Sequence, residues 1–315
     1  MKVLVTGGAG FIGSHLCERL LAEGADVAGI DCFTDYYPRT FKNANLAALA
    51  TSPRFTLVEA RVQDADLPRL LDGITHVFHL AAQAGVRKSW GGEFRHYTEN
   101  NIEATQVLLE ACAKSNLHRL VYASSSSVYG DAAAIPMRED ELPHPISPYG
   151  VTKLAGEHLC RLYHANFGVP SVSVRYFTVY GPRQRPDMAF HRFLRAALTG
   201  QPVHVYGDGR QTRDFTFISD AVSATVAAGT RETAGHVYNV GGGSRVSVNE
   251  VLTLVGRLVG KPLDIRYEAA QKGDMRDTYA DTSLAKRDFA YAPSITLEEG
   301  LDTELRWLLA MLATS

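Results

Sequence analysis

Short apolar runs alternate with helical patterns over the first 180 residues of the chain. The apolar runs are rich in Val, Ile, Leu and Phe, are bounded by Gly, Pro, Asp or Ser, and predict strands. They cover Lys2–Thr6, Ala25–Asp31, Phe55–Ala60, His76–Ala82, His118–Ser124 and Ser171–Phe177. Apolar residues three to four positions apart predict helices at Phe11–Glu23, Asn100–Lys114 and Pro148–Phe167.

Nearly continuous apolar strands separated by helices are typical of strands that are buried on both faces. We therefore predict an α/β fold with a doubly wound parallel sheet in residues 1–180. The alternation weakens afterwards, with a loop at 181–187 and a helix near Ala189–Thr199. Residues 181–315 are expected to form mainly a smaller C-terminal domain over the carboxyl edge of the sheet. Segments within about 214–241 are expected to return to the main domain and its sheet, namely 215–219 and 236–240.

The composition is that of a globular protein, with 45% hydrophobic and 21% charged residues. Lys and Arg number 32 against 34 Asp and Glu, so no bulk positive field favours nucleic acid or an anionic membrane. No apolar run reaches the roughly 18 residues of a spanning helix, and the first residues have no signal-peptide pattern. The four cysteines lack metal-ligand or disulfide spacing. We expect a cytoplasmic protein without nucleic-acid or membrane partners.

A glycine-rich loop follows the first strand, with Gly7, Gly10 and Gly13 spaced G-x-x-G-x-x-G. Glycine allows a tight turn and a close approach of the backbone to a pyrophosphate, and the following helix offers free N–H groups. Asp31 ends the next strand, where a carboxylate binds ribose hydroxyls and repels a 2′-phosphate. The combination predicts a dinucleotide site and favours NAD over NADP. FAD is the weaker alternative, and the three glycines alone also fit a plain turn.

Tyr149 and Lys153 lie four residues apart at the start of the third predicted helix, so both project from one face. A lysine ammonium close to a phenol favours the phenolate, and an oxidised nicotinamide adds further positive charge. We hypothesise that Tyr149 acts as a base when NAD⁺ is bound; a surface pair is the alternative. Ser125 lies in a hydroxyl-rich segment at a strand end, where open α/β sheets place ligands. It is placed to share a proton with Tyr149, unless the segment is only a Ser-rich loop.

Together these motifs resemble those of the extended short-chain dehydrogenase/reductase family, in particular its NAD-dependent nucleotide-sugar epimerases and most closely the UDP-glucuronate 4-epimerases. The resemblance implies a Rossmann-type NAD-binding domain, a smaller UDP-sugar-binding domain, and a homodimer. It extends from Met1 to about Asp281 through TGGAGFIG (6–13), LAAQAGVR (80–87), NIEAT (101–105), SSSSVYG (124–130), SPYGVTK (147–153), RYFTVYGPRQRPDMAF (175–190), GDGRQTRDFTFISD (207–220) and GDMRDTYAD (273–281).

The resemblance assigns roles to individual residues of this chain. The implied catalytic residues are Tyr149, Lys153 and Ser125. The implied NAD contacts are Gly7, Gly10, Phe11, Ile12, Gly13, Asp31, Leu80, Ala81, Ala82, Asn101, Tyr149, Lys153 and Tyr176. The implied sugar-nucleotide contacts are Arg87, Thr178, Arg213, Asp274 and Arg276, with Arg213 and Arg276 expected to clamp the diphosphate.

The chain departs from the family pattern at two positions. Arg61 replaces the acid that usually lies beside the adenine, although Val62 can still pack on the ring. Thr178 stands where many epimerases have Asn, which changes one polar contact with the substrate.

The 4-keto sugar formed in this family can be epimerised, dehydrated or decarboxylated. Related dehydratases and decarboxylases carry acids directly before Val-Tyr-Gly, whereas this chain has Ser126 and Ser127. A hydroxyl cannot replace a carboxylic acid as proton donor, so the sequence disfavours elimination.

Residues 178–190 resemble the corresponding segment of UDP-glucuronate 4-epimerases. Arg183 and Arg185 flank Gln184 there, and a guanidinium is a bidentate partner for a carboxylate. We expect Arg185, with Ser126 and Ser127, to hold the C6 carboxylate away from the alignment that favours decarboxylation. The alternative is that both arginines are structural, for example because one pairs with Asp187.

The sequence therefore predicts NAD-dependent C4 epimerisation of UDP-glucuronic acid to UDP-galacturonic acid, with Tyr149 as base. The alternatives are a UDP-glucose or UDP-N-acetylglucosamine 4-epimerase, a UDP-glucuronate decarboxylase, and a non-catalytic NAD(H)-sensing protein. His76 and His79 are interpreted as core or edge histidines, and no metal site is predicted.

Overall fold

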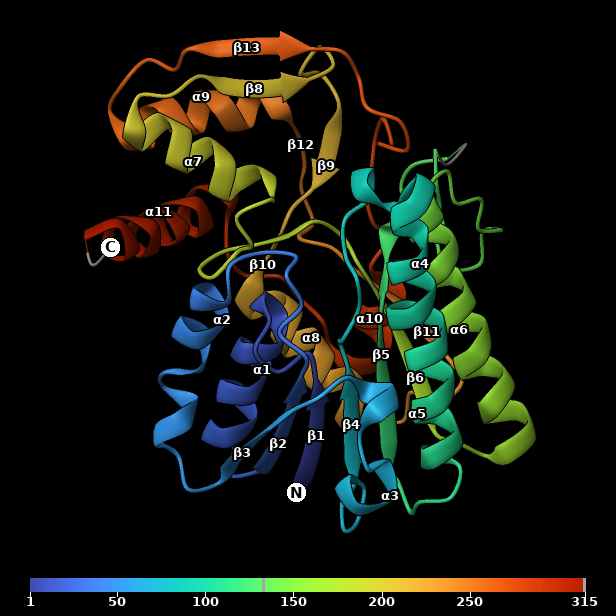
Figure 1. The fold of residues 1–315 in the computed structure, drawn as a ribbon. Helices are drawn as coiled ribbons and strands as arrows, with labels where there is room; N and C mark the ends of the chain where they lie inside the picture. Colours follow the sequence, from blue (N-terminus) through green and yellow to red (C-terminus); the bar gives the residue numbers. More distant parts are fainter. Residues whose placement is uncertain (132–133, 314–315) are drawn as a thin grey trace.

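A seven-stranded parallel sheet forms the lower half of the molecule in the computed structural model, which describes residues 1–131 and 134–313 (Figure 1). The strand order is β3-β2-β1-β4-β5-β6-β11, and each neighbouring pair is parallel. The strands are β1 (Lys2–Thr6), β2 (Asp26–Asp31), β3 (Phe55–Glu59), β4 (His76–His79), β5 (Arg119–Ser125), β6 (Ser171–Tyr176) and β11 (Val237–Val240).

Helices cover both faces of this sheet, as the alternation of strands and helices predicted. On one face, α1 (Phe11–Ala22) packs against α8 (Ile218–Thr230), and on the other α5 (Ala104–Cys112) packs against α6 (Pro148–Phe167). Shorter helices α2 (Arg39–Leu46), α3 (Leu67–Leu70) and α4 (Phe94–Tyr97) complete the N-terminal part of the chain. The predicted doubly wound fold is confirmed.

The two faces of each strand enter different hydrophobic cores. Val3 and Val5 belong to the core beneath α1 and α8, whereas Leu4 between them belongs to the core beneath α5 and α6. Val121 and Leu120 of β5 divide in the same way. Because side chains alternate along a strand, burial on both faces requires the continuous apolar runs found in the sequence.

The structure corrects the bounds of two predicted elements. The strand expected over His76–Ala82 ends at His79, and the next three residues line a cavity. The helix expected from Asn100 instead contains a π-helical turn, Thr98–Glu103, before α5 begins. Such turns add a residue to the helical repeat, so hydrophobic periodicity does not reveal them.

A smaller region lies above the carboxyl ends of the sheet strands (Figure 1). It contains three two-stranded sheets, β7–β10, β9–β12 and β8–β13, among the described residues. Its elements are β7 (Val179–Tyr180), α7 (Ala189–Thr199), β8 (Val203–Tyr206), β9 (Thr212–Asp214), β10 (Thr216–Phe217), β12 (Arg245–Ser247), α9 (Val248–Val259), β13 (Ile265–Glu268) and α11 (Leu297–Ala313). Helix α10 (Ser283–Phe289) lies lower, where it packs against β11 and α8 of the main domain (Figure 1). Only one of the two segments expected to rejoin the main sheet does so: β11 pairs with β6, whereas β10 pairs with β7.

The last two residues of the segment 181–315, Thr314 and Ser315, lie outside the described residues. Over residues 1–131 and 134–313, none of the helices has the length and apolar character needed to cross a membrane.

Candidate active site

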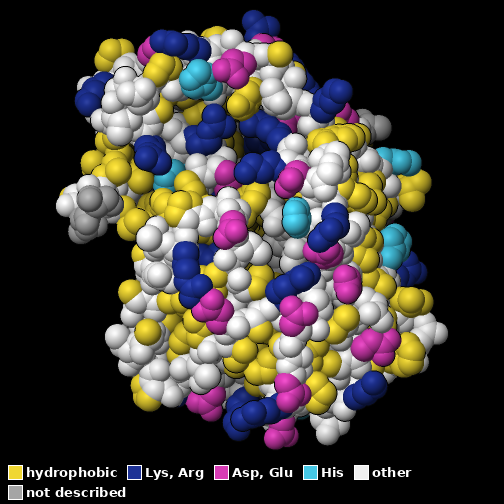
Figure 2. All heavy atoms as spheres, in the orientation of Figure 1, with side chains coloured by type: hydrophobic (Ala, Val, Ile, Leu, Met, Phe, Trp, Pro, Cys, Tyr) yellow, Lys and Arg dark blue, Asp and Glu magenta, His cyan; other side chains and the backbone are white. Residues whose placement is uncertain are grey.

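Two adjoining cavities open above the sheet, beside the point between β1 and β4 where the strand order reverses. The lower cavity, of about 490 Å³, is bounded by the strand ends, and the upper cavity, of about 610 Å³, is bounded by α7, β8 and α9. Arg87, Lys88, Arg192 and Arg213 line the upper cavity. Figure 2 shows Lys and Arg side chains gathered around a hollow in the upper half of this face. The position fits a site for an anionic ligand.

The glycine loop forms part of the lower cavity and has no room for side chains. A Cβ on Gly13 would lie 2.1 Å from the carbonyl oxygen of Gly7. Gly7 itself has a φ of +73°, and a Cβ there would lie 2.9 Å from the backbone nitrogen of Ala81. Helix α1 begins directly after Gly10 without a side-chain cap, so its first N–H groups remain available to an anion.

Asp31 lies at the end of β2, is only 6% exposed, and lines the lower cavity. Its carboxylate accepts hydrogen bonds from the backbone N–H groups of Ala9, at 3.2 Å, and Phe33, at 2.9 Å. Lys42 of α2 donates to it at 2.6 Å. Sequence reasoning missed this lysine, which no local motif connects with Asp31.

Arg61 and Val62 also line the lower cavity, at the position where the family pattern has an acid. Val62 is buried, and Arg61 forms an ion pair with Glu99 at 3.5 Å. The arginine is thus held toward the π-helical turn Thr98–Glu103 by a carboxylate of this chain, and the apolar Val62 remains as a surface for a flat ring.

Asn101 is placed differently from the prediction, because it is 1% exposed and does not appear among the described residues that line either cavity. Its side chain accepts from Gln83 N at 2.7 Å and donates to Thr152 Oγ1 at 2.9 Å. Thr152 in turn donates to the carbonyl of Tyr149 at 2.8 Å. The π-helical turn brings Asn100 to the cavity instead. Asn101 therefore joins the segment that carries Gln83 to the first turn of α6, and its contact with NAD stays a prediction.

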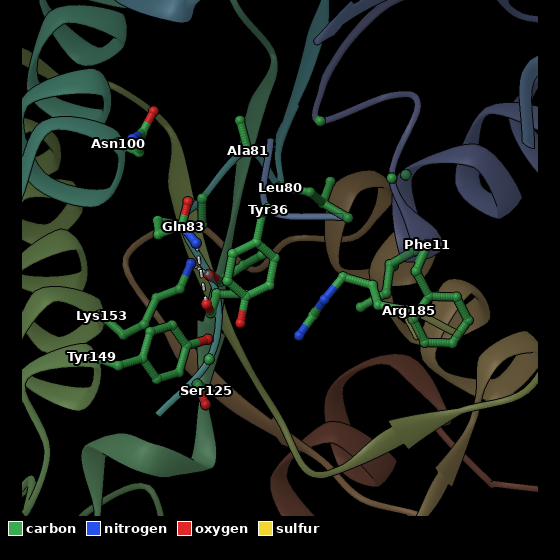
Figure 3. Close-up of a pocket in the computed structure, with 18 of the residues that line it drawn as sticks. Phe11, Tyr36, Leu80, Ala81, Gln83, Asn100, Ser125, Tyr149, Lys153 and Arg185 are labelled. Atoms are coloured by element: carbon green, nitrogen blue, oxygen red, sulfur yellow. Dashed lines mark hydrogen bonds between the residues drawn. The ribbon is translucent and has the colours of Figure 1, made fainter. Parts of the chain in front are cut away.

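Tyr149, Ser125 and Lys153 meet in the lower cavity (Figure 3). The first turn of α6 carries Tyr149, and Ser147 caps this turn by accepting from Gly150 N at 3.1 Å. Ser125 ends β5 and lies beside Tyr149 in Figure 3, and its hydroxyl forms a hydrogen bond that acts on the Tyr149 phenol. Lys153, one turn further along α6, donates from Nζ to the carbonyl of Ala123 at 2.9 Å.

Burial dominates the electrostatics of this group in the protein alone, and the predicted base form of Tyr149 with NAD⁺ bound stays a prediction. Burial raises the pKa of Tyr149, while the hydrogen bond with Ser125 and the charge of Arg185 lower it. Burial also lowers the pKa of Lys153, to about 8. In the protein alone, burial outweighs the groups that favour a phenolate, so Tyr149 is a neutral phenol until further positive charge arrives.

The arginines expected on the sugar-nucleotide side fall into two classes. Arg213 lines both cavities and donates to three backbone carbonyls, those of Thr212, Met275 and Arg276, at 2.7–3.0 Å. Arg276 is exposed and pairs with Asp208 at 3.2 Å. Its side chain is not among the described lining of either cavity, so the two-arginine clamp of Arg213 and Arg276 stays a prediction.

Arg87 and Asp274 do line both cavities, as expected, and they pair with each other. Arg87 Nη2 donates to Asp274 at 2.7 Å, and the guanidinium also lies 4.2 Å from the ring centre of Tyr206. A charged group and an aromatic face are therefore presented together at the upper cavity.

Arg183 and Arg185 have separate roles. Arg183 has a φ of +68° and pairs with Glu18 at 2.7 Å, which anchors the loop to α1. Arg185 points into the lower cavity from the side opposite Tyr149 (Figure 3) and donates from Nε and Nη2 to the two oxygens of Asp187, both at 2.9 Å. Although burial disfavours its charged form, Asp187 raises the pKa of Arg185, so the guanidinium stays charged.

The remaining predicted contacts line the lower cavity: Gly10, Phe11, Ile12, Leu80, Ala81, Ala82, Ser126, Ser127, Tyr176 and Thr178. Ser126 and Ser127 are both buried and form the turn after Ser125. Asp31 and Asp274 are the carboxylates among the described lining residues, and each is paired with a cation. No described carboxylic acid of this cavity therefore lies free beside Ser125.

Tyr36 was also missed by sequence reasoning. It lines both cavities, donates to Asp187 at 3.3 Å, and lies under Lys88, whose Nζ is 4.7 Å from the ring centre. It belongs to the loop after β2, so only the tertiary fold brings it to Arg185. Across residues 1–131 and 134–313, no cluster of three or more His, Cys, Asp or Glu side chains is arranged to hold a metal.

Residues 3–241 match the model of the NAD dependent epimerase/dehydratase family. The chain is 46% identical to a Bacillus subtilis protein named uncharacterized UDP-glucose epimerase YtcB, over 99% of both chains. It is 38% identical to the UDP-glucuronate 4-epimerase of Thermodesulfobacterium geofontis, over 96% of this chain and 95% of that one. Among solved structures it is similar to UDP-glucuronic acid 4-epimerase from Bacillus cereus in complex with UDP-glucuronic acid and NAD, with a TM-score of 0.97 and 46% identity over 99% and 100% of the two chains.

Proposed function

Because the chain belongs to the NAD dependent epimerase/dehydratase family, we propose that it converts UDP-glucuronic acid to UDP-galacturonic acid by epimerisation at C4. The observation that carries the proposal is the cavity in which the glycine loop, the Ser125–Tyr149–Lys153 group and Arg185 face one another. A binding protein that only senses NAD(H) has no use for a buried phenol and ammonium at this point.

The residues present fit NAD as the resident cofactor. The glycine loop excludes side chains where a pyrophosphate approaches the backbone, and Asp31 offers a buried carboxylate for the ribose hydroxyls. NAD, when bound, supplies the redox chemistry by taking up the C4 hydrogen with its electron pair and giving it back. The residues proposed to hold it are Gly7, Gly10, Phe11, Ile12, Gly13, Asp31, Lys42, Val62, Leu80, Ala81, Ala82, Tyr149, Lys153 and Tyr176.

Tyr149 takes the proton of the C4 hydroxyl and later returns it. Because the hydride taken from C4 would be returned as well, the reaction has no net redox change. Lys153, fixed on the carbonyl of Ala123, stabilises the negative charge that develops on the phenol oxygen. Ser125 shares a hydrogen bond with the same oxygen and orients the substrate hydroxyl. Epimerisation requires the keto sugar to turn within the cavity and present its other face.

The residues beside Ser125 determine whether the 4-keto sugar is epimerised, dehydrated or decarboxylated. Dehydration needs a proton donor, and Ser126 and Ser127 provide only hydroxyl groups. We propose that these hydroxyls, Thr178 and Arg185 hold the C6 carboxylate out of the geometry for decarboxylation. Arg87, Arg213 and Asp274 are proposed to contact the diphosphate and nucleoside.

One observation favours a second candidate, a 4-epimerase for neutral UDP-hexoses. The fork of Arg185 is already occupied by Asp187, so the pair carries no net charge toward the sugar. The name of the Bacillus subtilis relative refers to UDP-glucose as well.

The deciding experiment incubates the pure protein with UDP-glucuronate, without added cofactor and then with NAD, and identifies the sugar by NMR. UDP-galacturonate supports the proposal. A UDP-pentose with carbon dioxide indicates a decarboxylase, and turnover of UDP-glucose alone selects the second candidate. If neither UDP-glucuronate nor UDP-glucose gives any product, the proposal that the protein is an enzyme is contradicted.

We also propose a cytoplasmic homodimer in which residues 1–180 bind NAD and residues 181–315 mainly bind the UDP-sugar. Val151 and Leu162 support self-association, because they lie on one face of α6 and are 47% and 54% exposed. Light scattering on the purified protein tests the dimer.

A further inference from the structure

A buried ion pair lies directly behind the Ser125–Tyr149–Lys153 group. Glu157 of α6 and Arg175 of β6 are 6% and 3% exposed. Arg175 donates from Nε and Nη2 to the two carboxylate oxygens at 2.9 and 2.7 Å. Neither residue is among the described lining of the two cavities. Burying two charges has a large desolvation free energy. Because this pair does not line either cavity, we looked for the elements that it holds in place.

We propose that the Glu157–Arg175 pair is a positioning element of the active site. It fixes the strand end that carries Ser125 against the helix that carries Tyr149 and Lys153, and it keeps a negative charge one turn from the Lys153 ammonium. The inference rests on the proposed function, because it concerns the same catalytic group.

The pair fixes the end of β5 through the residue that directly precedes Ser125. The hydroxyl of Ser124 donates to Oε1 of Glu157. Ser124 is buried, directly precedes Ser125, and lies opposite Arg175 in the register of β5 and β6. One carboxylate therefore joins α6, β5 and β6 at a point one residue from Ser125.

The pair also contacts the residue that follows the turn Ser126–Val128. The guanidinium carbon of Arg175 lies 4.6 Å from the ring centre of Tyr129, which follows the turn Ser126–Val128. The hydroxyl of Tyr129 donates to Asn239 Oδ1 at 2.7 Å. The segment that presents four cavity serines, Ser124 to Ser127, is thus fixed on both sides by the same ion pair.

The electrostatic contribution acts on Lys153. Glu157 lies four residues after Lys153 on the same helix face, and its charge opposes the effect of burial, which lowers the pKa of Lys153. Burial raises the pKa of the nearby Cys160, so this group stays a neutral thiol. From the sheet, the ring centre of Tyr122 lies 5.2 Å from the Lys153 ammonium nitrogen. His79 is neutral because burial and the charge of Lys153 lower its pKa to about 3. Among the described groups that act on Lys153, Glu157 is the carboxylate.

The test compares Glu157→Gln with wild type in NAD-loaded protein, measuring kcat and KM for UDP-glucuronate across the pH range. A neutral residue at position 157 favours the neutral amine of Lys153, so the loss of activity with rising pH begins at lower pH. We expect kcat near pH 8.5 to fall at least about tenfold, the change near pH 6.5 to stay below about threefold, and KM to change little. The matched control is Glu110→Gln, which removes a carboxylate that accepts from Tyr163 at the far end of α6. It should keep the wild-type pH profile.

Two further measurements guard against a variant that fails to fold and against failure of the proposed function. The double variant Glu157→Gln/Arg175→Met leaves no unpaired buried charge and should show the same change in pH profile. The ¹³Cε resonance of Lys153 in lysine-labelled protein reports its protonation without turnover and should titrate at lower pH in both variants. A wild-type pH profile and a wild-type Lys153 titration in any folded variant overturn the inference. A wild type that turns over no substrate contradicts the proposed function, while the titration still decides the inference.

Discussion

The two walls of the candidate site are built on different principles. The lower wall, around the glycine loop, is formed by backbone packed so closely that even a Cβ does not fit at Gly13. The upper wall is formed by arginines, and Arg87 and Arg185 are each already bound to a carboxylate of this chain. A wall of backbone selects its ligand by shape and changes little. A wall of ion pairs selects by charge, and each pair can exchange its partner for a substrate anion.

The strongest test of this difference is a methyl group on the lower wall. In Gly13→Ala, the added Cβ would lie 2.1 Å from Gly7 O. We expect the Kd for NAD to rise at least about 100-fold, because two backbone segments must separate. Calorimetric titration with NAD measures the effect. Gly92→Ala is the control, since its Cβ would meet no other segment of the described chain within 4 Å. Equal affinity in both variants contradicts the steric account.

On the upper wall, Arg213 should contribute more than any exposed arginine. Its partners are backbone carbonyls, so its charge remains available to an anion. Arg213→Met should raise the KM for UDP-glucuronate about 30-fold and leave NAD affinity unchanged, because a charge-assisted hydrogen bond is lost. Arg276→Ala should change KM by less than about twofold, in keeping with the weak contribution of exposed ion pairs. Steady-state kinetics compare the two, and equal effects would support the two-arginine clamp.

Lys42 is the exception on the lower wall, since it adds an ion pair to a surface otherwise built from backbone. Its Nζ lies 2.6 Å from Asp31, and both side chains are buried. Lys42→Met should raise the Kd for NAD about tenfold, because an unpaired buried carboxylate no longer keeps its orientation. Fluorescence titration with NADH provides the measurement. Unchanged affinity would show that the backbone N–H groups of Ala9 and Phe33 suffice to hold Asp31.

The smallest expected effect concerns the exchange of partners on Arg185. If Asp187 competes with the substrate carboxylate, then Asp187→Asn frees the guanidinium fork. The KM for UDP-glucuronate should then fall about three- to fivefold, the size of one partly exposed ion pair, while that for UDP-glucose stays constant. Parallel assays of both substrates measure the ratio. A rise in both KM values instead indicates that Asp187 orients Arg185.

The lower wall was largely predictable from the sequence because its determinants are local. Gly7, Gly10 and Gly13 are bounded by a strand and a helix, and Tyr149 and Lys153 share one helical turn. Their roles follow from spacing along a single element. The sheet was predictable for the same reason, since burial on both faces leaves continuous apolar runs.

The other residues depend on contacts between distant segments, which spacing does not encode. Lys42 reaches Asp31 only through the packing of α2, and Tyr36 reaches Asp187 across 151 residues. The π-helical turn exchanges Asn101 for Asn100 at the cavity, and no hydrophobic period signals that shift. Arg276 was placed by its motif, but Asp208 holds it on the surface.

The close approach of Gly7 to Ala81 has a practical consequence for altering this protein. Where main chain meets main chain, there are no side chains to exchange, so the glycine loop offers almost nothing to mutagenesis. New sugar preferences must come from side chains of the upper wall, where Tyr36, Arg185 and Asp187 meet. Libraries restricted to these three positions should therefore retain cofactor binding in most of their members.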